Sequence, residues 1–93
     1  RFGSVISYGG AMFEVNRYNN ISVVGLHGKL SRDNMHVLEK VLSSLSECSQ
    51  NNVVLNFERI EHVDYRMVRR IIERMVAFKC DGGDLKVAAA NGY

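Results

Sequence analysis

The sequence predicts an α/β domain with a mixed sheet, its elements in the order β-β-α-β-α-β. Three observations predict it. Two stretches that suit β-strands are separated by a pair of asparagines, two later stretches have apolar residues at helical spacing, and a short apolar run lies between the two helical stretches. Strand–helix–strand units imply parallel strands joined by right-handed crossovers, so we expect the helices to pack on the sheet. A length of 93 residues suits one domain with a modest core.

The first two strands are predicted to form a hairpin. Residues 11–18 alternate in part between apolar and polar side chains, and residues 21–30 are rich in β-branched side chains. Asn19–Asn20 lies between them, and asparagine tolerates the positive φ that a tight turn needs. The hairpin therefore adds an antiparallel edge to the sheet.

Residues 1–10 fit no element clearly. Val5 and Ile6 suit the start of a short strand, and residues 7–10 indicate a loop. We therefore treat residues 1–10 as an N-terminal extension of uncertain role and residues 11–93 as the domain.

A first helix follows, with Ser31 or Asp33 as its N-terminal cap. It is expected to end near Cys48, where a polar loop begins. Its apolar residues recur at the i, i+3, i+4, i+7 spacing of one helical face, and they are Leu38, Val41, Leu42 and Leu45.

Residues 53–57 form a nearly continuous apolar run, which is typical of a strand buried on both faces. Residues 58–63 are then expected to connect to a second helix. That helix ends at Asp81–Gly83, where glycine suits the left-handed closing residue, and a last strand begins at about Leu85.

The second helix is predicted from about Tyr65 to Lys79, capped by Asp64. Tyr65 and Arg66 are unusual residues for a first helical turn, where small hydroxyl residues and anions are favoured. The expected buried stripe is Met67 or Val68, with Ile71, Ile72, Met75 and Phe78. The expected solvated side is Arg66, Arg69, Arg70, Glu73 and Arg74.

Several function classes are not supported by the sequence. The net charge of +2 is too small for a dedicated nucleic-acid binder, so the arginines of the second helix indicate a solvated or protein-binding surface. No apolar run approaches the roughly 18 residues that a membrane span needs, and no signal peptide is visible. We therefore expect no nucleic acid and no membrane insertion.

Catalytic and metal sites are also not expected. No serine lies in a Gly-x-Ser-x-Gly turn, and His27, His36 and His62 indicate surface or partly packed side chains. Cys48 and Cys80 form no Cys-x-x-Cys pair; their spacing leaves a disulfide open, and a reduced cytosolic pair is the better interpretation. The sequence predicts no enzyme, no cofactor and no metal.

The order and spacing of these pieces resemble the STAS domains of bacterial anti-sigma-factor antagonists. Gly28-Lys29-Leu30 is similar to the Gly-Glu-Leu that closes a strand in that family, and the run at 53–57, the Gly82–Gly83 pair and the strand from Asp84 follow in the family's order. The resemblance covers about residues 13–93. It implies a STAS-like fold and a cytoplasmic, non-enzymatic signalling module whose partner is an anti-sigma factor or a kinase-type regulator.

The resemblance also points to one junction. In the family the loop before the second helix contains Asp-Ser-Ser-Gly, and phosphorylation of its second serine releases the anti-sigma factor, because a phosphate at a helix start changes the charge and shape of the face. Here the motif falls on Asp64-Tyr65-Arg66-Met67, so only the aspartate is retained. Arg66 stands at the phosphoacceptor position, and we expect Tyr65 to pack beside the loop. The resemblance therefore implies partner binding without this switch.

The expected partner-binding residues surround that junction. They are Asp64, Tyr65, Arg66, Met67, Arg69, Arg70 and Glu73, together with Ser31, Arg32 and Asp33, whose loop also follows the carboxyl end of a strand. Two alternatives stay open. One is a small-ligand or nucleotide-binding regulatory domain in which Arg66 holds an anion, and the other is an assembly or scaffold subunit of a larger complex.

The family continues past the last strand with another helix and strand, which have no counterpart here before Tyr93. The expectation is that the domain is truncated, that another chain or a larger parent completes it, or that residues 1–10 replace part of it. An uncovered sheet edge invites pairing with a second copy, so we expect a homodimer.

Overall fold

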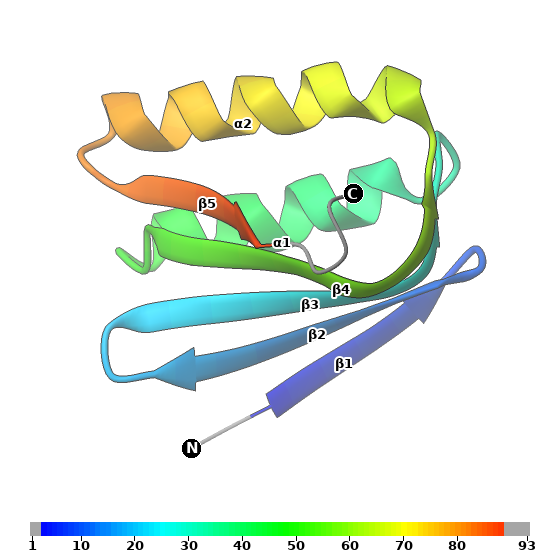
Figure 1. Ribbon diagram of the computed structural model, residues 1–93. Coiled ribbons are helices and arrows are strands. Elements are labelled where there is room, and N and C mark those ends of the chain that lie inside the picture. Colours follow the sequence, from blue (N-terminus) through cyan, green and yellow to red (C-terminus); the bar gives the residue numbers. More distant parts are fainter. Residues whose placement is uncertain (1–2, 89–93) are drawn as a thin grey trace.

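A computed structural model describes residues 3–88 of the chain (Figure 1). Its elements follow the order β-β-β-α-β-α-β, with a 3₁₀ turn, η1, before the second helix. The bounds are β1 (Gly3–Tyr8), β2 (Ala11–Tyr18), β3 (Ile21–Leu30), α1 (Met35–Glu47), β4 (Asn52–Val63), η1 (Tyr65–Met67), α2 (Val68–Cys80) and β5 (Asp84–Ala88).

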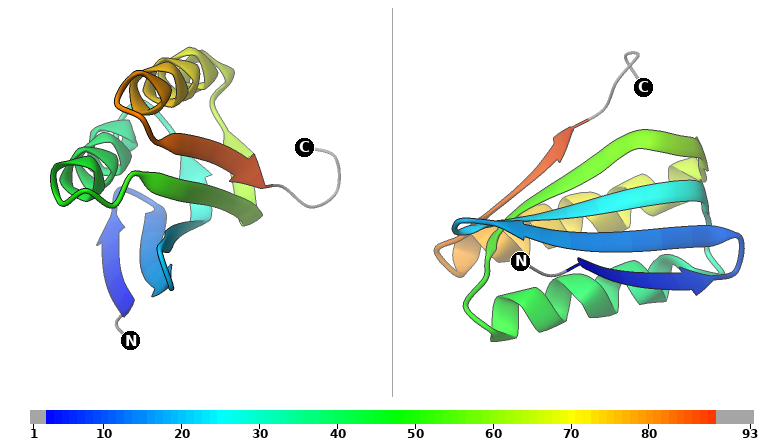
Figure 2. Two further views of the ribbon diagram at one scale, coloured as in Figure 1. Left: turned by 90° about the vertical axis from the view of Figure 1, so that its left-hand side faces the viewer. Right: turned by 90° about the horizontal axis from the view of Figure 1, so that it is seen from below.

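The strands form one sheet in the order β1-β2-β3-β4-β5. Neighbours among β1, β2 and β3 are antiparallel, whereas β3, β4 and β5 run parallel. Both helices lie on the same face of the sheet, and within residues 3–88 no helix covers the other face (Figures 1 and 2). The predicted α/β class, the mixed sheet and the packing of the helices on the sheet are confirmed.

The core lies between the sheet and the two helices. The predicted stripe of the first helix is confirmed, since three of its four residues are buried and Leu45 packs against the core. Apolar side chains from every element except β1 complete the core, because alternate strand residues point at the helices. The largest fully buried apolar side chains are Phe13, Val24, Leu26, Leu30, Met35, Leu38, Leu42, Leu55 and Phe78.

The predicted element order holds from β2 onward, and β1 precedes it. The hairpin is confirmed, because β2 pairs with β3 across Asn19–Asn20, with Asn19 at a φ of 57°. β1 extends to Tyr8 and turns back at Gly9–Gly10, so the loop predicted over residues 7–10 is wrong in its first half. The antiparallel edge strand of the sheet is therefore β1, and the β2–β3 hairpin lies between β1 and β4.

β4 is longer than predicted. Residues 58–63, expected to be a connection, form its second half. The register between β3 and β4 shifts twice, so that β4 takes in extra residues and the alternation of its buried positions breaks. The first half is not buried on both faces, because Val54, on the face without helices, is only partly buried.

α2 begins three residues later than expected because η1 precedes it. Met67, Ile71 and Phe78 are buried as predicted, and Met75 packs against the core. Ile72 was also expected in the buried stripe, but its side chain is 53% exposed. It lies one position, about 100°, further around the helix than Ile71.

The side chains considered for catalysis and metal binding lie apart. Within residues 3–88 no group of three His, Cys, Asp or Glu side chains could hold a metal ion, and no helix is long and apolar enough to cross a membrane. Cys48 and Cys80 are free and exposed. His62 belongs to β4 rather than to a connection, and it too is exposed.

Candidate partner-binding site

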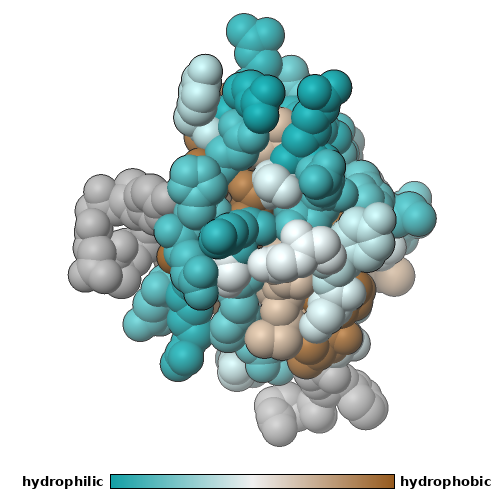
Figure 3. All heavy atoms as spheres, turned by 90° about the vertical axis from the view of Figure 1, so that its right-hand side faces the viewer, coloured by the Kyte–Doolittle hydropathy of each residue, from teal (hydrophilic) through white to brown (hydrophobic). Residues whose placement is uncertain are grey.

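The candidate site lies where two neighbouring parallel strands end. Leu30 of β3 pairs with Val63 of β4, and the backbone N–H of Asp64 donates to the carbonyl of Leu30 at 2.9 Å. The loop at 31–34 and the junction at Asp64 therefore leave the sheet side by side. This end of the molecule is mostly hydrophilic (Figure 3).

Asp64 caps the turn, as the sequence predicts. Its Oδ1 accepts from the backbone N–H of Arg66 at 3.0 Å, and its carbonyl accepts from the N–H of Met67 at 2.8 Å. The Arg66 guanidinium folds back onto the same carboxylate, with Nε 3.0 Å from Oδ1 and Nη2 2.7 Å from Oδ2. A cation is tolerated at this helix start because the capping carboxylate neutralises it.

This pairing gives the junction a defined pH dependence. Hydrogen bonds from the side chain and backbone of Arg66 lower the pKa of Asp64 from 3.8 to about 2. A carboxyl group with a lowered folded pKa stabilises the fold above its unfolded pKa, and that stability disappears as the pH falls through the folded value.

We expect the thermal stability advantage of the wild type over Asp64→Asn to be complete above about pH 4 and to vanish near pH 2. Asparagine keeps a capping oxygen, so the comparison isolates the charge. Thermal unfolding followed by circular dichroism across this pH range measures it. An advantage that grows on acidification would contradict the assignment.

The two arginines in the first turn of α2 differ in availability. Arg70 reaches α1, where Nε donates to Glu39 Oε2 at 3.0 Å and Nη2 donates to Glu39 Oε1. It joins the two helices, and this pairing further raises its pKa. Arg69 is exposed and has no ion pair within residues 3–88. Of the two, Arg69 is the one free to meet a partner.

An exposed apolar stripe, not predicted from the sequence, runs along η1 and α2. Tyr65 is 82% exposed, so the expectation that it packs beside the loop is wrong. Val68, Ile72 and Val76 follow at intervals of one helical turn and are 44%, 53% and 58% exposed. Their i, i+4, i+8 spacing was the available signal. We call Tyr65, Val68, Arg69, Ile72 and Val76 the α2 face.

The remaining predicted residues take different positions. Met67 is only 4% exposed and packs in the core, so it offers almost no surface to a partner. Glu73 is exposed on α2, Arg32 and Asp33 are exposed in the neighbouring loop, and Ser31 is partly buried there.

Neither Ser31 nor Asp33 caps α1, contrary to expectation. The N-cap residue is Asn34, which is fully buried and turns its side chain away from the helix. Its Oδ1 accepts from the N–H of Ser31 at 2.9 Å, and its Nδ2 donates to the carbonyls of Gly9 at 2.9 Å and Lys29 at 2.8 Å. Asn34 thus fixes the loop beside the candidate site.

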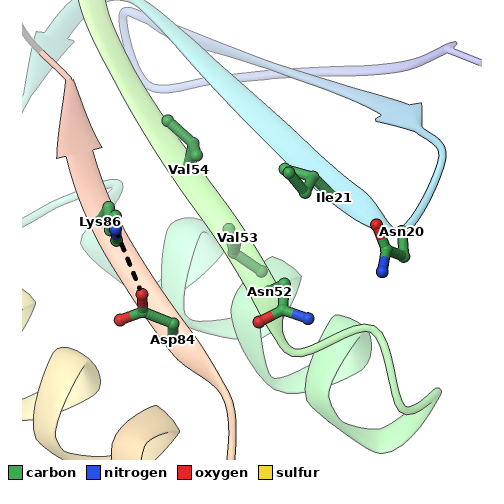
Figure 4. Close-up of a pocket in the computed structure, with 7 residues that line it drawn as sticks. All are labelled: Asn20, Ile21, Asn52, Val53, Val54, Asp84 and Lys86. Atoms are coloured by element: carbon green, nitrogen blue, oxygen red, sulfur yellow. Dashed lines mark ion pairs between the residues drawn. The ribbon is translucent and has the colours of Figure 1, made fainter.

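A hollow of about 280 Å³ lies at the opposite end of the sheet, near the starts of β3, β4 and β5 (Figure 4). Its lining is mixed, with Asn20, Ile21 and Val53 among the contributors. Its two charged residues, Asp84 and Lys86, pair with each other at 3.6 Å. Nothing in this hollow is linked to the Asp64 junction.

Comparisons with known proteins bear on the fold. The family model of the STAS domain matches residues 12–93. None of the curated proteins matches the sequence significantly. A crystal structure of Mglu superposes with a TM-score of 0.74 at 23% identity, over 84% of this chain and 19% of that one. This chain therefore spans about a fifth of the length of that protein.

Two further crystal structures share the fold. An anti-sigma factor antagonist from Mycobacterium paratuberculosis has a TM-score of 0.74 at 16% identity, over 85% of this chain and 67% of that one. Mglu in its L-glutamate binding form has a TM-score of 0.70 at 16% identity, over 84% of this chain and 26% of that one. At these identities the similarity shows the fold alone.

Proposed function

The chain belongs to the STAS domain family, and on that premise we propose that it is a non-enzymatic protein-interaction module of bacterial signalling. It binds a protein partner, of the anti-sigma-factor or kinase-regulator type, through the α2 face. Binding is constitutive, because the position of the phosphorylated serine in the family holds Arg66.

The observation that carries this proposal is the exposed apolar stripe beside Arg69, a cation that has no ion pair within residues 3–88. Aromatic and arginine side chains are enriched at protein interface hot spots. Tyr65 in η1 and Arg69 in α2 both lie at the solvent, as Ile72 of α2 does. The partner surface that fits is apolar at its centre and acidic at its rim. The Asp64–Arg66 pair supports a fixed shape at one end of this face, and it leaves Arg66 engaged rather than open to an anion.

The proposal is tested by capture and reconstitution. The chain is used as bait in lysate from its source, beside Ile72→Asp and the matched control Ile21→Asp, which alters an isoleucine of similar exposure on β3. We expect a protein that the wild type and Ile21→Asp retain and Ile72→Asp loses. With the purified pair, Ile72→Asp should raise the Kd by about 30-fold or more, the size of a hot-spot loss.

Two results would count against the proposal. One is a reconstituted complex in which Ile72→Asp binds as tightly as Ile21→Asp, since the α2 face would then be unused. The other is phosphate found by mass spectrometry on Ser31 or Tyr65 after incubation with the partner and ATP, if that phosphate releases the partner. Binding would then be switched at another residue.

A further inference from the structure

β1 is a sheet edge without the usual protection against pairing. Its sequence, Gly3–Tyr8, holds no charged residue and no proline, and its register with β2 contains no bulge. Val5, Ile6 and Tyr8 are 58%, 41% and 50% exposed. The opposite edge strand, β5, is shorter and carries Asp84 and Lys86 among its residues.

The backbone of β1 presents free hydrogen-bonding groups outward. Gly9 and Gly10 have φ values of 58° and 85°, as in the type I′ turn of a tight hairpin, so Tyr8 and Ala11 form the hydrogen-bonded pair that closes it. Because bonded and non-bonded pairs alternate along an antiparallel ladder, the N–H and C=O groups of Val5 and Ser7 face away from β2.

A groove of about 420 Å³ runs along the same edge, between β1 and α1. Its lining is mainly apolar, and the polar side chains in it are Ser4, His36, Lys40 and Ser44. Ile6 and Val15 line it from the sheet, and Val37, Val41 and Leu45 line it from the helix. Hydrophobic atoms are visible at the lower right of Figure 3, on the side where β1 and α1 lie. The unpaired edge and the apolar groove are therefore continuous.

We propose that two copies of this chain dimerise by antiparallel pairing of their β1 strands about a two-fold axis at Ile6. Val5 of each copy then lies opposite Ser7 of the other, which matches the outward groups on both sides. The two Ile6 side chains meet on the helix-bearing face, and the two grooves join into one trough between the α1 helices. The result is a single sheet through both copies, with a shared ladder of about 20 Å.

A second copy of this chain is the partner that suits the β1 edge best. Two-fold pairing places the strand against itself, which is unfavourable for a charged strand, but the paired β1 strands bring no like charges opposite each other because β1 is neutral. β1 also precedes residue 12, where the STAS match begins, so this edge is an addition to the matched segment. It lies at the far side of the sheet from β5, the strand that α2 contacts, so both copies keep their α2 faces free.

Sedimentation equilibrium across a concentration series tests this inference. The wild type should show a reversible monomer–dimer equilibrium. Val5→Lys should raise the dimer Kd by at least about tenfold, because lysine on an edge strand blocks pairing and the two copies bring their lysines close together. The matched control is Val87→Lys, the same change at an exposed valine of the opposite edge, which should leave the Kd unchanged.

A second variant tests the same pairing independently, in case Val5→Lys does not fold. Ser7→Pro removes only an outward N–H, so the β1–β2 ladder should persist while dimerisation is lost. Circular dichroism confirms that each variant is folded. A wild type that stays monomeric at every concentration, or a dimer that Val87→Lys dissociates and Val5→Lys does not, would overturn the proposal. Neither result bears on the α2 face.

Discussion

Replacing Gly28 with alanine is expected to destabilise the fold by about 3 kcal/mol. Gly28 has a φ of 84°, a conformation that costs an L-residue about 1–2 kcal/mol. A Cβ at this position would also lie 2.3 Å from the carbonyl oxygen of Gly10, so the backbone of the β1–β2 turn must move. That movement strains the hydrogen bond from Lys29 N–H to the same oxygen, now 3.1 Å long. Urea unfolding at equilibrium measures the loss.

Gly82→Ala is the matched control for Gly28→Ala. Gly82 has almost the same φ, 81°, but no atom lies within 4 Å of a Cβ placed there. Its substitution should therefore cost only the conformational strain, about 1 kcal/mol. Equal losses at the two glycines would contradict the role of crowding at Gly28 and leave backbone conformation as the whole effect.

The fold was predictable from sequence wherever burial follows one simple period. β2 and α1 show their strand or helix period in the residues themselves, and β3 and the first half of β4 show runs of β-branched or apolar residues that indicate strands. The second half of β4 does not, because the register shifts against β3 place Glu58 and Arg59 next to each other at the solvent, and adjacent charged residues indicate a loop. β1 is so short and so exposed that its sequence shows no pattern of buried residues.

In the candidate site too, local interactions could be predicted from the sequence, whereas exposure that depends on packing could not. The Asp64 cap is a local interaction, so the sequence predicts it. The exposure of Ile72 does not follow from its sequence neighbours, because η1 and α2 together carry two adjacent apolar rows, one through Met67 and Ile71 and one through Val68 and Ile72. Periodicity shows both rows, and only the packing of the helix against the sheet decides which of them faces solvent.

The role of Asn34 could not be predicted from the sequence. Its Nδ2 donates to the carbonyl of Gly9, in the β1–β2 turn, and to that of Lys29, near the end of β3. No local pattern relates Asn34 to a turn 25 residues away. Yet this side chain connects three segments beside the candidate site, so its substitution should have a large effect.

We expect Asn34→Asp to destabilise the fold by about 4 kcal/mol near neutral pH. The change is nearly isosteric, but it replaces an NH₂ group that donates to two backbone carbonyls with an oxygen that can donate to neither. A buried carboxylate would then face both carbonyl oxygens. The pKa of the new carboxyl should rise, so the loss should shrink as the pH falls through that raised value. Urea unfolding at several pH values measures both effects.

Asn51→Asp is the comparison that separates this mechanism from a change in net charge. Asn51 is more exposed, and its amide donates one bond, to the carbonyl of Asp81 at 3.3 Å. The same substitution there should cost about 0.5 kcal/mol, because water can solvate both the carboxylate and the carbonyl that loses its donor. Similar losses at the two asparagines, or a loss at Asn34 that grows in acid, would show that the buried hydrogen bonds of Asn34 do not hold the three segments together.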